Sequence, residues 1–154
     1  MSKIGKFKQG EIKVTQGQRK KHVSQMSDYE LRRLCRRIKG IKRLNTSWHL
    51  SQKIKKKEIS FTHDMIWDVL KNIHKSHIIE YNISMFNGRD ESRVLLRTHK
   101  SYPVQIDSKG QVYCNLCFVI TLNTGRIVTA YWNDAKDNHK SINLNRYDEK
   151  LEII

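Results

Sequence analysis

The hydrophobic period of this chain changes near residue 77, and this change constrains the fold more than any other feature. Before it, apolar residues recur every three to four positions, which is typical of helices that bury one stripe. After it, they alternate with polar residues, which is typical of strands that bury one face. The order predicts an α+β protein whose N-terminal helices pack on an antiparallel sheet of four to five strands.

Three amphipathic stretches precede the change, and each carries residues that begin or end a helix. The predicted helices cover about residues 28–39, 46–57 and 62–75. Ser27 and Glu30 form a capping box before the first helix, and Gly40 is placed to end it. The candidate N-caps of the other two are Asn45 or Thr46, and Ser60 or Thr62.

The second half of the chain alternates strands with turn residues. The predicted strands cover residues 77–85, 93–99, 111–122 and 126–133. Asn87-Gly88 and Asn123-Thr124-Gly125 are the turn signals between them, and Pro103 breaks the run after the second strand. Residues 144–154 are a candidate edge strand.

The positive charge of the chain lies at one end. Residues 1–57 hold 18 Lys and Arg against 3 Asp and Glu, whereas residues 58–154 hold 12 of each kind. A neutral body with a basic front half is the electrostatic signature of a nucleic-acid-binding protein. The alternatives are an anionic membrane surface as the partner, or a solvated face without a binding role.

Within this basic region we predict a flexible arm over residues 1–25, followed by one α+β domain over residues 26–154. The predicted first helix carries a cationic face, and the predicted second helix places two lysines on the face of His49. The candidate RNA-binding residues are Asn133 on the last predicted strand and, on these two helices, Arg32, Arg33, Arg36, Arg37, Lys53 and Lys56.

The three cysteines, Cys35, Cys114 and Cys117, are too few for a disulfide framework and are typical of a reducing compartment. No apolar run has the length of a membrane span, and no apolar stretch follows the basic N-terminus. We therefore expect a cytoplasmic protein. Cys114 and Cys117 are three apart on a predicted strand and point to opposite faces, so we expect no zinc there, and no other metal or cofactor.

Polar side chains form two rows on the predicted sheet. Arg93, Arg97 and His99 share one face of their strand. In the last strand the shared face carries Thr129, Tyr131 and Asn133, opposite to Val128, Ala130 and Trp132. If the rows are neighbours, they form a site suited to phosphoryl chemistry without metal. Histidine can transfer protons near neutral pH, and arginine can hold a phosphate with two parallel hydrogen bonds.

The order of these segments resembles the RelE-like and colicin D-like toxins of the barnase/EndoU/colicin/RelE ribonuclease superfamily. The matching segments are Trp48-His49-Leu50, Glu58-Ile59-Ser60, Arg93-Val94-Leu95-Leu96-Arg97, Phe118-Val119-Ile120 and Gly125-Arg126-Ile127-Val128-Thr129-Ala130-Tyr131-Trp132-Asn133. The resemblance covers about residues 46–148 and rests on short, degenerate motifs.

Membership would imply metal-independent cleavage of tRNA or mRNA, leaving a 2′,3′-cyclic phosphate and a 5′-hydroxyl. It would also imply a neutralising antitoxin or immunity protein as a partner. We expect such a toxin-type ribonuclease to be carried by a phage or mobile element. Carried over by position, His49 would be the general base or acid. Arg93 and Arg97 would stabilise the phosphate, while Thr129 and Tyr131 would line the site.

Each assignment has a plainer alternative. His49 can be a surface or helix-packing histidine, with His139 as the reserve catalytic residue. The two sheet arginines can pair with Glu80 or Asp90. For the whole chain, the rival functions are a non-catalytic nucleic-acid-binding regulator and an inhibitor that turns its basic face to an acidic host protein.

Overall fold

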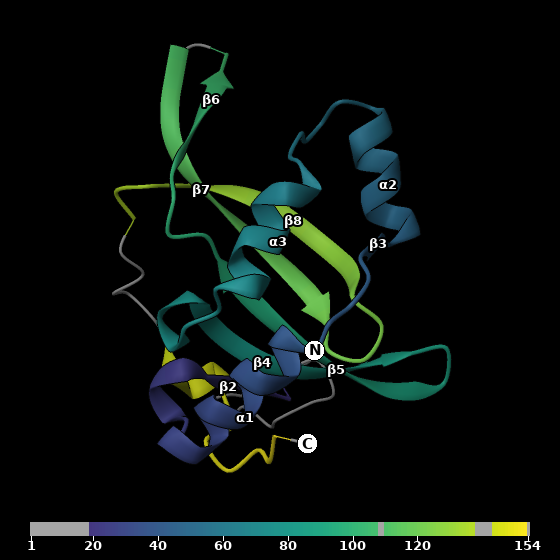
Figure 1. The fold of residues 1–154 in the computed structure, drawn as a ribbon, viewed down its shortest axis with the longest axis vertical. Helices are drawn as coiled ribbons and strands as arrows, with labels where there is room; N and C mark the ends of the chain where they lie inside the picture. The colour runs from purple at the N-terminus through teal and green to yellow at the C-terminus, as the bar shows by residue number, and fades with distance from the viewer. Residues whose placement is uncertain (1–18, 108–109, 138–142, 154) are drawn as a thin grey trace, which may run out of the picture.

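The computed structural model describes residues 19–107, 110–137 and 143–153, and these form a twisted sheet with helices packed against it (Figure 1). The strands are β2 (Lys20–His22), β3 (Asn45–Thr46), β4 (Ile78–Phe86), β5 (Arg89–Arg97), β6 (Tyr102–Ile106), β7 (Gly110–Thr121) and β8 (Arg126–Asp134). The α-helices are α1 (Asp28–Lys39), α2 (Trp48–Lys55) and α3 (His63–Lys71), and short 3-10 helices are η2 (Val23–Gln25), η3 (Lys75–His77) and η4 (Leu144–Arg146).

The mixed helix and sheet content is as predicted, but the prediction of four to five strands is wrong. In the described residues the sheet has seven strands in the order β2-β4-β5-β7-β8-β3, with β6 paired to β7. The additional strands β2, β3 and β6 have three, two and five residues. They are too short to show a clear alternation of apolar and polar residues. The sheet is antiparallel except that β3 runs parallel to β8.

The helix starts follow the local hydrogen bonds. Ser27 and Glu30 form the predicted capping box of α1, and Thr62 is the N-cap of α3. The predicted N-caps of α2 are wrong, since Asn45 and Thr46 form β3 and Ser47 is the cap. The hydroxyl of Ser47 accepts a hydrogen bond from the Leu50 amide at 3.1 Å and donates one to the Val128 carbonyl at 2.9 Å. The start of α2 is therefore fixed to β8.

The core lies between the sheet and the helices α1 and α3, which cover the near face of the sheet in Figure 1. Its helix side is contributed by Leu31, Leu34, Ile38, Ile66, Val69 and Leu70, and its central sheet side by Val94, Leu96, Leu116, Phe118 and Ile120. Successive strand residues point to opposite faces, so the intervening residues of β5 and β7 face away from α1 and α3. That second face carries the predicted polar rows.

Two irregularities shape the second face. Asn87 and Gly88 both have positive φ, 52° and 78°, and turn β4 into β5 as the Asn-Gly signal predicts. In the β7–β8 pair, Val119 is opposite Thr129 whereas Ile120 is opposite Ile127, so Val128 is an extra residue. Such a bulge reverses the facing of the residues before it. The predicted grouping of Val128 with Ala130 and Trp132 therefore fails, and Val128 lines a pocket together with Thr129.

The two ends of the chain differ from the sequence prediction. Residues 19–25, assigned to the arm, belong to the folded body, because β2 pairs antiparallel with β4 and η2 follows it. The rest of the arm, residues 1–18, lies outside the described residues, as does His139. Residues 144–146 form η4 instead of an edge strand. No described helix has the length and apolarity needed to cross a membrane.

Candidate nucleic-acid interface

Four of the predicted site residues meet at one pocket between α2 and the sheet. Its volume is about 450 Å³. We call it the α2 pocket. The predicted residues around it come from three elements: His49 and Lys53 from α2, Arg93 from β5, and Thr129 from β8. The rest of its lining is Ser47, Trp48, Leu50, Phe86, Arg126 and Val128.

Aromatic and basic side chains at the start of α2 stand open to solvent. Trp48 is 74% exposed, which is unusual for the largest apolar side chain, and its ring lies 6.1 Å from that of His49. His49 and Lys53 are also exposed, while Leu50 is buried and anchors the helix. The pocket therefore presents an aromatic ring, an imidazole and an ammonium group together on its helix side.

A shared carboxylate organises the sheet side of the pocket. Glu91 accepts hydrogen bonds from Arg126 at 2.7 and 2.8 Å and from Nε of Arg93 at 3.0 Å. Burial would raise the pKa of Glu91, but the hydrogen bonds from Arg126 and Arg93 outweigh it and hold the pKa below its usual value. Arg93 thus pairs with Glu91 and not with the predicted Glu80 or Asp90. Two guanidinium groups against one carboxylate leave the sheet side positively charged.

Arg126 and Phe86 are the main residues of this pocket that the sequence prediction missed. The Arg126 guanidinium lies 3.8 Å from the centre of the Phe86 ring, close enough for a cation–π contact. Strict alternation would place Arg126 on the helix-covered face with Ala130. The bulge at Val128 brings it to the pocket face instead, and no local sequence signal marks that bulge.

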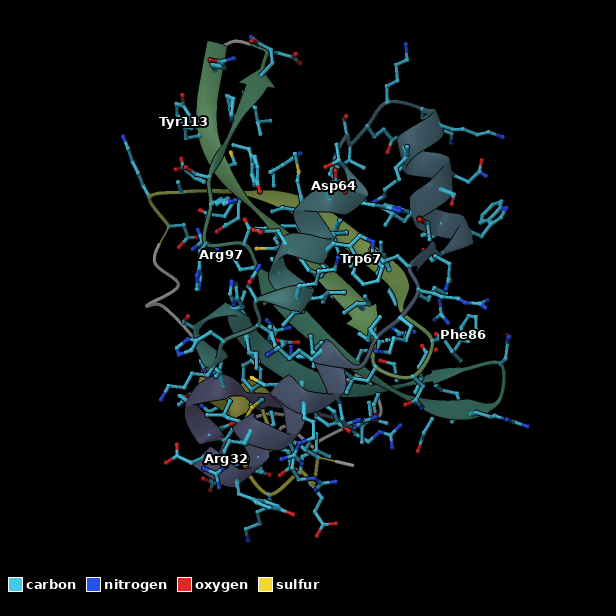
Figure 2. All side chains as sticks on the ribbon, in the orientation of Figure 1. Arg32, Asp64, Trp67, Phe86, Arg97 and Tyr113 are labelled. Carbon is cyan, nitrogen blue, oxygen red and sulfur yellow. The ribbon has the colours of Figure 1, made fainter. Side chains whose placement is uncertain are left out.

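The other three predicted sheet residues lie away from this pocket. Figure 2 shows Arg97 on the left of the molecule, far from Phe86 on the right. Arg97 donates hydrogen bonds to the backbone carbonyls of Asp134 and Asp137, both at 3.2 Å. Asn133 donates to the Asp137 carboxylate at 3.1 Å. These contacts hold the turn that follows β8.

Tyr131 belongs to the same distant end of the sheet. It stands opposite Cys117 across β7–β8, and Cys117 stands opposite Arg97 across β5–β7. Burial, followed by the interaction with the Cys117 thiol, raises the pKa of Tyr131 to about 12. Its phenol is therefore a poor acid near neutral pH. Thr129 and Tyr131 share a face, as predicted, but only Thr129 reaches the α2 pocket.

The four arginines of α1 do not form one cationic face. Arg32 and Arg36 line a pocket with His74 and Lys75. Arg33 donates to the Ile153 carbonyl at 3.5 Å, and Arg37 donates to the Asn123 side chain at 3.1 Å. Lys56 is the C-cap residue of α2 and is not among the residues that line the α2 pocket.

Histidine and cysteine elsewhere give no metal centre within the residues that the structure describes. His99, which the sequence places in the row of Arg97, stacks on His77 with ring centres 3.6 Å apart and hydrogen-bonds Ser76. Cys114 and Cys117 are free and buried.

We compared the chain with protein-family models, with curated proteins and with solved structures, and none of them matches it.

Proposed function

We propose that this protein is a metal-independent endoribonuclease whose site is the α2 pocket. The observation that carries the proposal is the meeting of His49, Lys53, Arg93 and Thr129 around one pocket. His49 and Thr129 are 80 residues apart in the sequence, and the four residues come from one helix and two different strands. They comprise a proton-transfer group, phosphate-binding cations and a hydroxyl, which together are the groups that RNA cleavage requires.

The reaction that suits these groups is attack by the ribose 2′-hydroxyl on the adjacent phosphorus. A base removes the 2′-hydroxyl proton as the new O–P bond forms. The bond from phosphorus to the 5′-oxygen breaks, and an acid gives that oxygen a proton. The products are a 2′,3′-cyclic phosphate and a 5′-hydroxyl. We assign proton transfer to His49, because it is the one histidine of the pocket lining and imidazole is the side chain that most often serves as general acid or base.

Charge and stacking supply the binding. Lys53 adds a positive charge to the surplus left by Arg93, Arg126 and Glu91, so the pocket attracts the charge that grows on the phosphate. Trp48 and Phe86 are 74% and 42% exposed and offer faces on which unpaired bases can stack. The substrate class is therefore single-stranded or looped RNA, with tRNA and mRNA as the candidates.

The same proposal includes the setting that the ribonuclease resemblance implies. We propose a cytoplasmic enzyme of a phage or mobile element that is held inactive by an antitoxin or immunity protein. A basic, exposed pocket of this kind suits an acidic inhibitor that occupies it in place of RNA.

A second candidate is a non-catalytic RNA-binding regulator. It is favoured by the ion pair between Arg93 and Glu91, because a guanidinium already held at 2.9 Å by a carboxylate has fewer donors left for a phosphate. This candidate uses the same pocket for binding and predicts that no RNA is cut.

The test is incubation of the purified protein with tRNA and with mRNA in EDTA, followed by end-group analysis of the fragments. Wild type should release 2′,3′-cyclic phosphate ends. His49→Ala should cut about 10²- to 10⁴-fold more slowly, since that is the usual contribution of a general acid or base. His63→Ala is the matched control, because His63 is exposed at the start of α3 and lines none of the pockets described here. Intact RNA that is still bound would favour the regulator.

A further inference from the structure

We infer that a bound RNA strand extends beyond the α2 pocket, across the β7–β8 turn, to a second cationic pocket at the end of α1. The inference rests on the RNA binding in the proposed function and names the course of the substrate. It is carried by three adjoining pockets and by the charges at their two ends.

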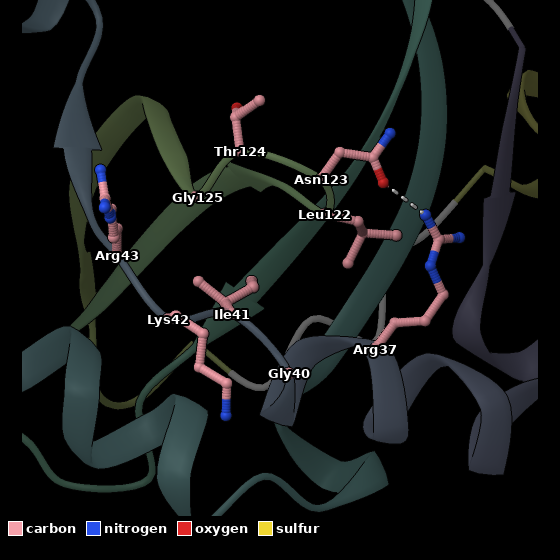
Figure 3. Close-up of a pocket in the computed structure, with 9 residues that line it drawn as sticks. All are labelled: Arg37, Gly40, Ile41, Lys42, Arg43, Leu122, Asn123, Thr124 and Gly125. Carbon is pink, nitrogen blue, oxygen red and sulfur yellow. Dashed lines mark hydrogen bonds between the residues drawn. The ribbon is translucent and has the colours of Figure 1, made fainter.

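Each pocket shares lining residues with the next one. A pocket of about 410 Å³ lies between the β4–β5 hairpin tip and the β7–β8 turn, and it shares Phe86 and Arg126 with the α2 pocket. We call it the hairpin pocket. A further pocket of about 420 Å³, the turn pocket, shares Asn123 and Thr124 with the hairpin pocket (Figure 3). A strand leaving the α2 pocket past Phe86 therefore meets the hairpin pocket and then the turn pocket.

The turn pocket is cationic. Arg37, Lys42 and Arg43 line it, and no Asp or Glu is among its lining residues. Arg37 is oriented by the hydrogen bond from its Nη2 to the Asn123 side chain, drawn in Figure 3. Lys42 and Arg43 are exposed. Three cations around one hollow without an acidic partner in its lining are suited to phosphate groups.

The hairpin pocket between them is close to neutral. Its lining holds two carboxylates, Asp90 and Glu91, and two arginines, Arg89 and Arg126. Arg126 holds Glu91 at 2.7 Å, and Arg19, outside the lining, holds Asp90 at 2.7 Å. The remaining polar lining consists mostly of amides and hydroxyls, which suit the hydrogen-bonding edges of bases. A base in the hairpin pocket with phosphates toward either end agrees with this distribution of charge.

The turn pocket is held in place by backbone contacts. Gly125 has φ +67°, and a Cβ atom there would overlap the carbonyl oxygen of Arg43. The Asn45 amide donates to the Gly125 carbonyl at 3.1 Å, and its side chain donates to the Thr124 carbonyl at 3.1 Å. The segment that carries Lys42 and Arg43 is thereby fixed against the turn before any ligand binds.

The length of the path sets the size of the RNA. Residues 126–129 follow β8, which rises about 3.3 Å per residue, whereas residues 123–125 form the turn, so Asn123 and Thr129 lie at most about 20 Å apart. Stacked nucleotides advance about 3.4 Å each, so about six of them cover this distance. An oligonucleotide much shorter than that fills only one of the pockets.

The test compares short and long uridine oligomers with 2′-O-methyl riboses, which bind but cannot be cut. Their dissociation constants are measured at several salt concentrations, with oligomers of about three and about ten nucleotides. The variant is Lys42→Ser/Arg43→Ser. The matched control, Lys136→Ser/Lys150→Ser, removes the same charge from residues that line none of the three pockets.

We expect the Lys42/Arg43 variant to bind the long oligomer about tenfold more weakly and the short one as wild type does. Two lost phosphate contacts should also reduce the salt dependence of long-oligomer binding by about 1.4 in the logarithmic slope. Equal loss for both oligomers, or an equal loss in the control, would overturn the inference.

These outcomes are separate from the fate of the nuclease proposal. If wild type cuts RNA but the length dependence is unchanged by the Lys42/Arg43 variant, the path across the turn is wrong and the nuclease proposal stands. If the length dependence falls as expected but no RNA is cut, the path holds and the regulator replaces the nuclease. Failure of wild type to bind either oligomer overturns the path, and the cleavage assay alone then decides the nuclease proposal.

Discussion

Arg93 and Arg97 lie on the same face of β5, four residues apart, yet their surroundings differ completely. Arg93 shares Glu91 with Arg126 and borders a pocket that also holds His49 and Lys53. Arg97 donates to two backbone carbonyls of the turn after β8. One guanidinium is part of a charged pocket, and the other holds a loop in place.

The difference shows what decides the role of a polar residue in a strand. Alternation along the strand determines which face of the sheet a side chain points to. Its hydrogen-bond and ion-pair partners come from whichever element packs over that part of the face. At the Arg93 end the crossing elements are α2 and the bulged start of β8. At the Arg97 end it is the Asp134–Asp137 turn. The first arrangement gathers charged side chains and a proton-transfer group around a pocket, and the second uses its donors on backbone carbonyls.

Cleavage rates should separate the two arginines most strongly. We expect Arg93→Gln to slow RNA cleavage about 10²- to 10³-fold, the usual effect of losing one electrostatic donor to the reacting phosphate. Arg97→Gln should leave the rate within about twofold of wild type. Single-turnover rates of the two variants, with circular dichroism as a folding control, give the comparison. Equal losses in both would mean that the two ends belong to one site.

Stability should depend more on the carboxylate at the Arg93 end. Glu91→Gln leaves two part-buried guanidinium groups without their counter-charge and should lower the free energy of unfolding by about 2–3 kcal/mol. Arg97→Gln should cost about 1–2 kcal/mol, because it removes hydrogen bonds to neutral carbonyls. Urea denaturation measures both. Asp90→Asn is the control for losing a carboxylate at an exposed pair and should cost less than Glu91→Gln.

The same two variants should differ in their pH dependence. The ordinary pKa of a glutamate is near 4.3, and the folded-state pKa of Glu91 lies below that ordinary value. The contribution of Glu91 to the free energy of unfolding is therefore complete above the ordinary value. It is lost as the pH falls through the folded-state pKa. The gap in unfolding free energy between wild type and Glu91→Gln should therefore shrink below about pH 4. The gap for Arg97→Gln should stay constant, and a gap for Glu91→Gln that does not shrink would contradict the ion-pair assignment.

The smallest expected effect on stability belongs to Trp48. Because this side chain is 74% exposed, Trp48→Ala should change the free energy of unfolding by less than about 0.5 kcal/mol. The binding of single-stranded RNA by the Trp48→Ala variant should nevertheless weaken by about 1–3 kcal/mol, the usual contribution of one stacked base. Tyr113→Ala is the matched control, since Tyr113 is 59% exposed on the separate β6–β7 hairpin. Unchanged RNA affinity in Trp48→Ala would remove the stacking role.

Sequence patterns predicted the parts of the fold that depend on local chemistry. The capping box of Ser27 and Glu30 and the Asn87-Gly88 turn were both marked by residues adjacent in the chain. The same holds for the buried stripes of α1 and α3. These features are confirmed because each results from interactions within a few residues.

The rest depends on contacts between distant segments. Asn45 and Thr46 looked like N-caps, but pairing with Arg126 and Ile127 makes them a strand. Arg126 entered the candidate site through a bulge that no residue type marks. Phe86 stands beside the predicted Asn87-Gly88 turn, but the turn signal does not show which pocket it borders. The alternation of strand residues predicted the shared face of Arg93 and Arg97 and that of Thr129 and Tyr131. It could not show that one end of this face borders a pocket while the other end holds the turn after β8.

The first measurement we would make is a backbone-amide NMR titration with a 2′-O-methyl uridine oligomer. Binding at the α2 pocket should shift the resonances of Ser47, His49, Phe86, Arg93 and Thr129. The resonances of Arg97, Tyr131 and residues 134–137 should stay in place. Shifts confined to the Arg97 end would contradict the assignment of the site to the α2 pocket.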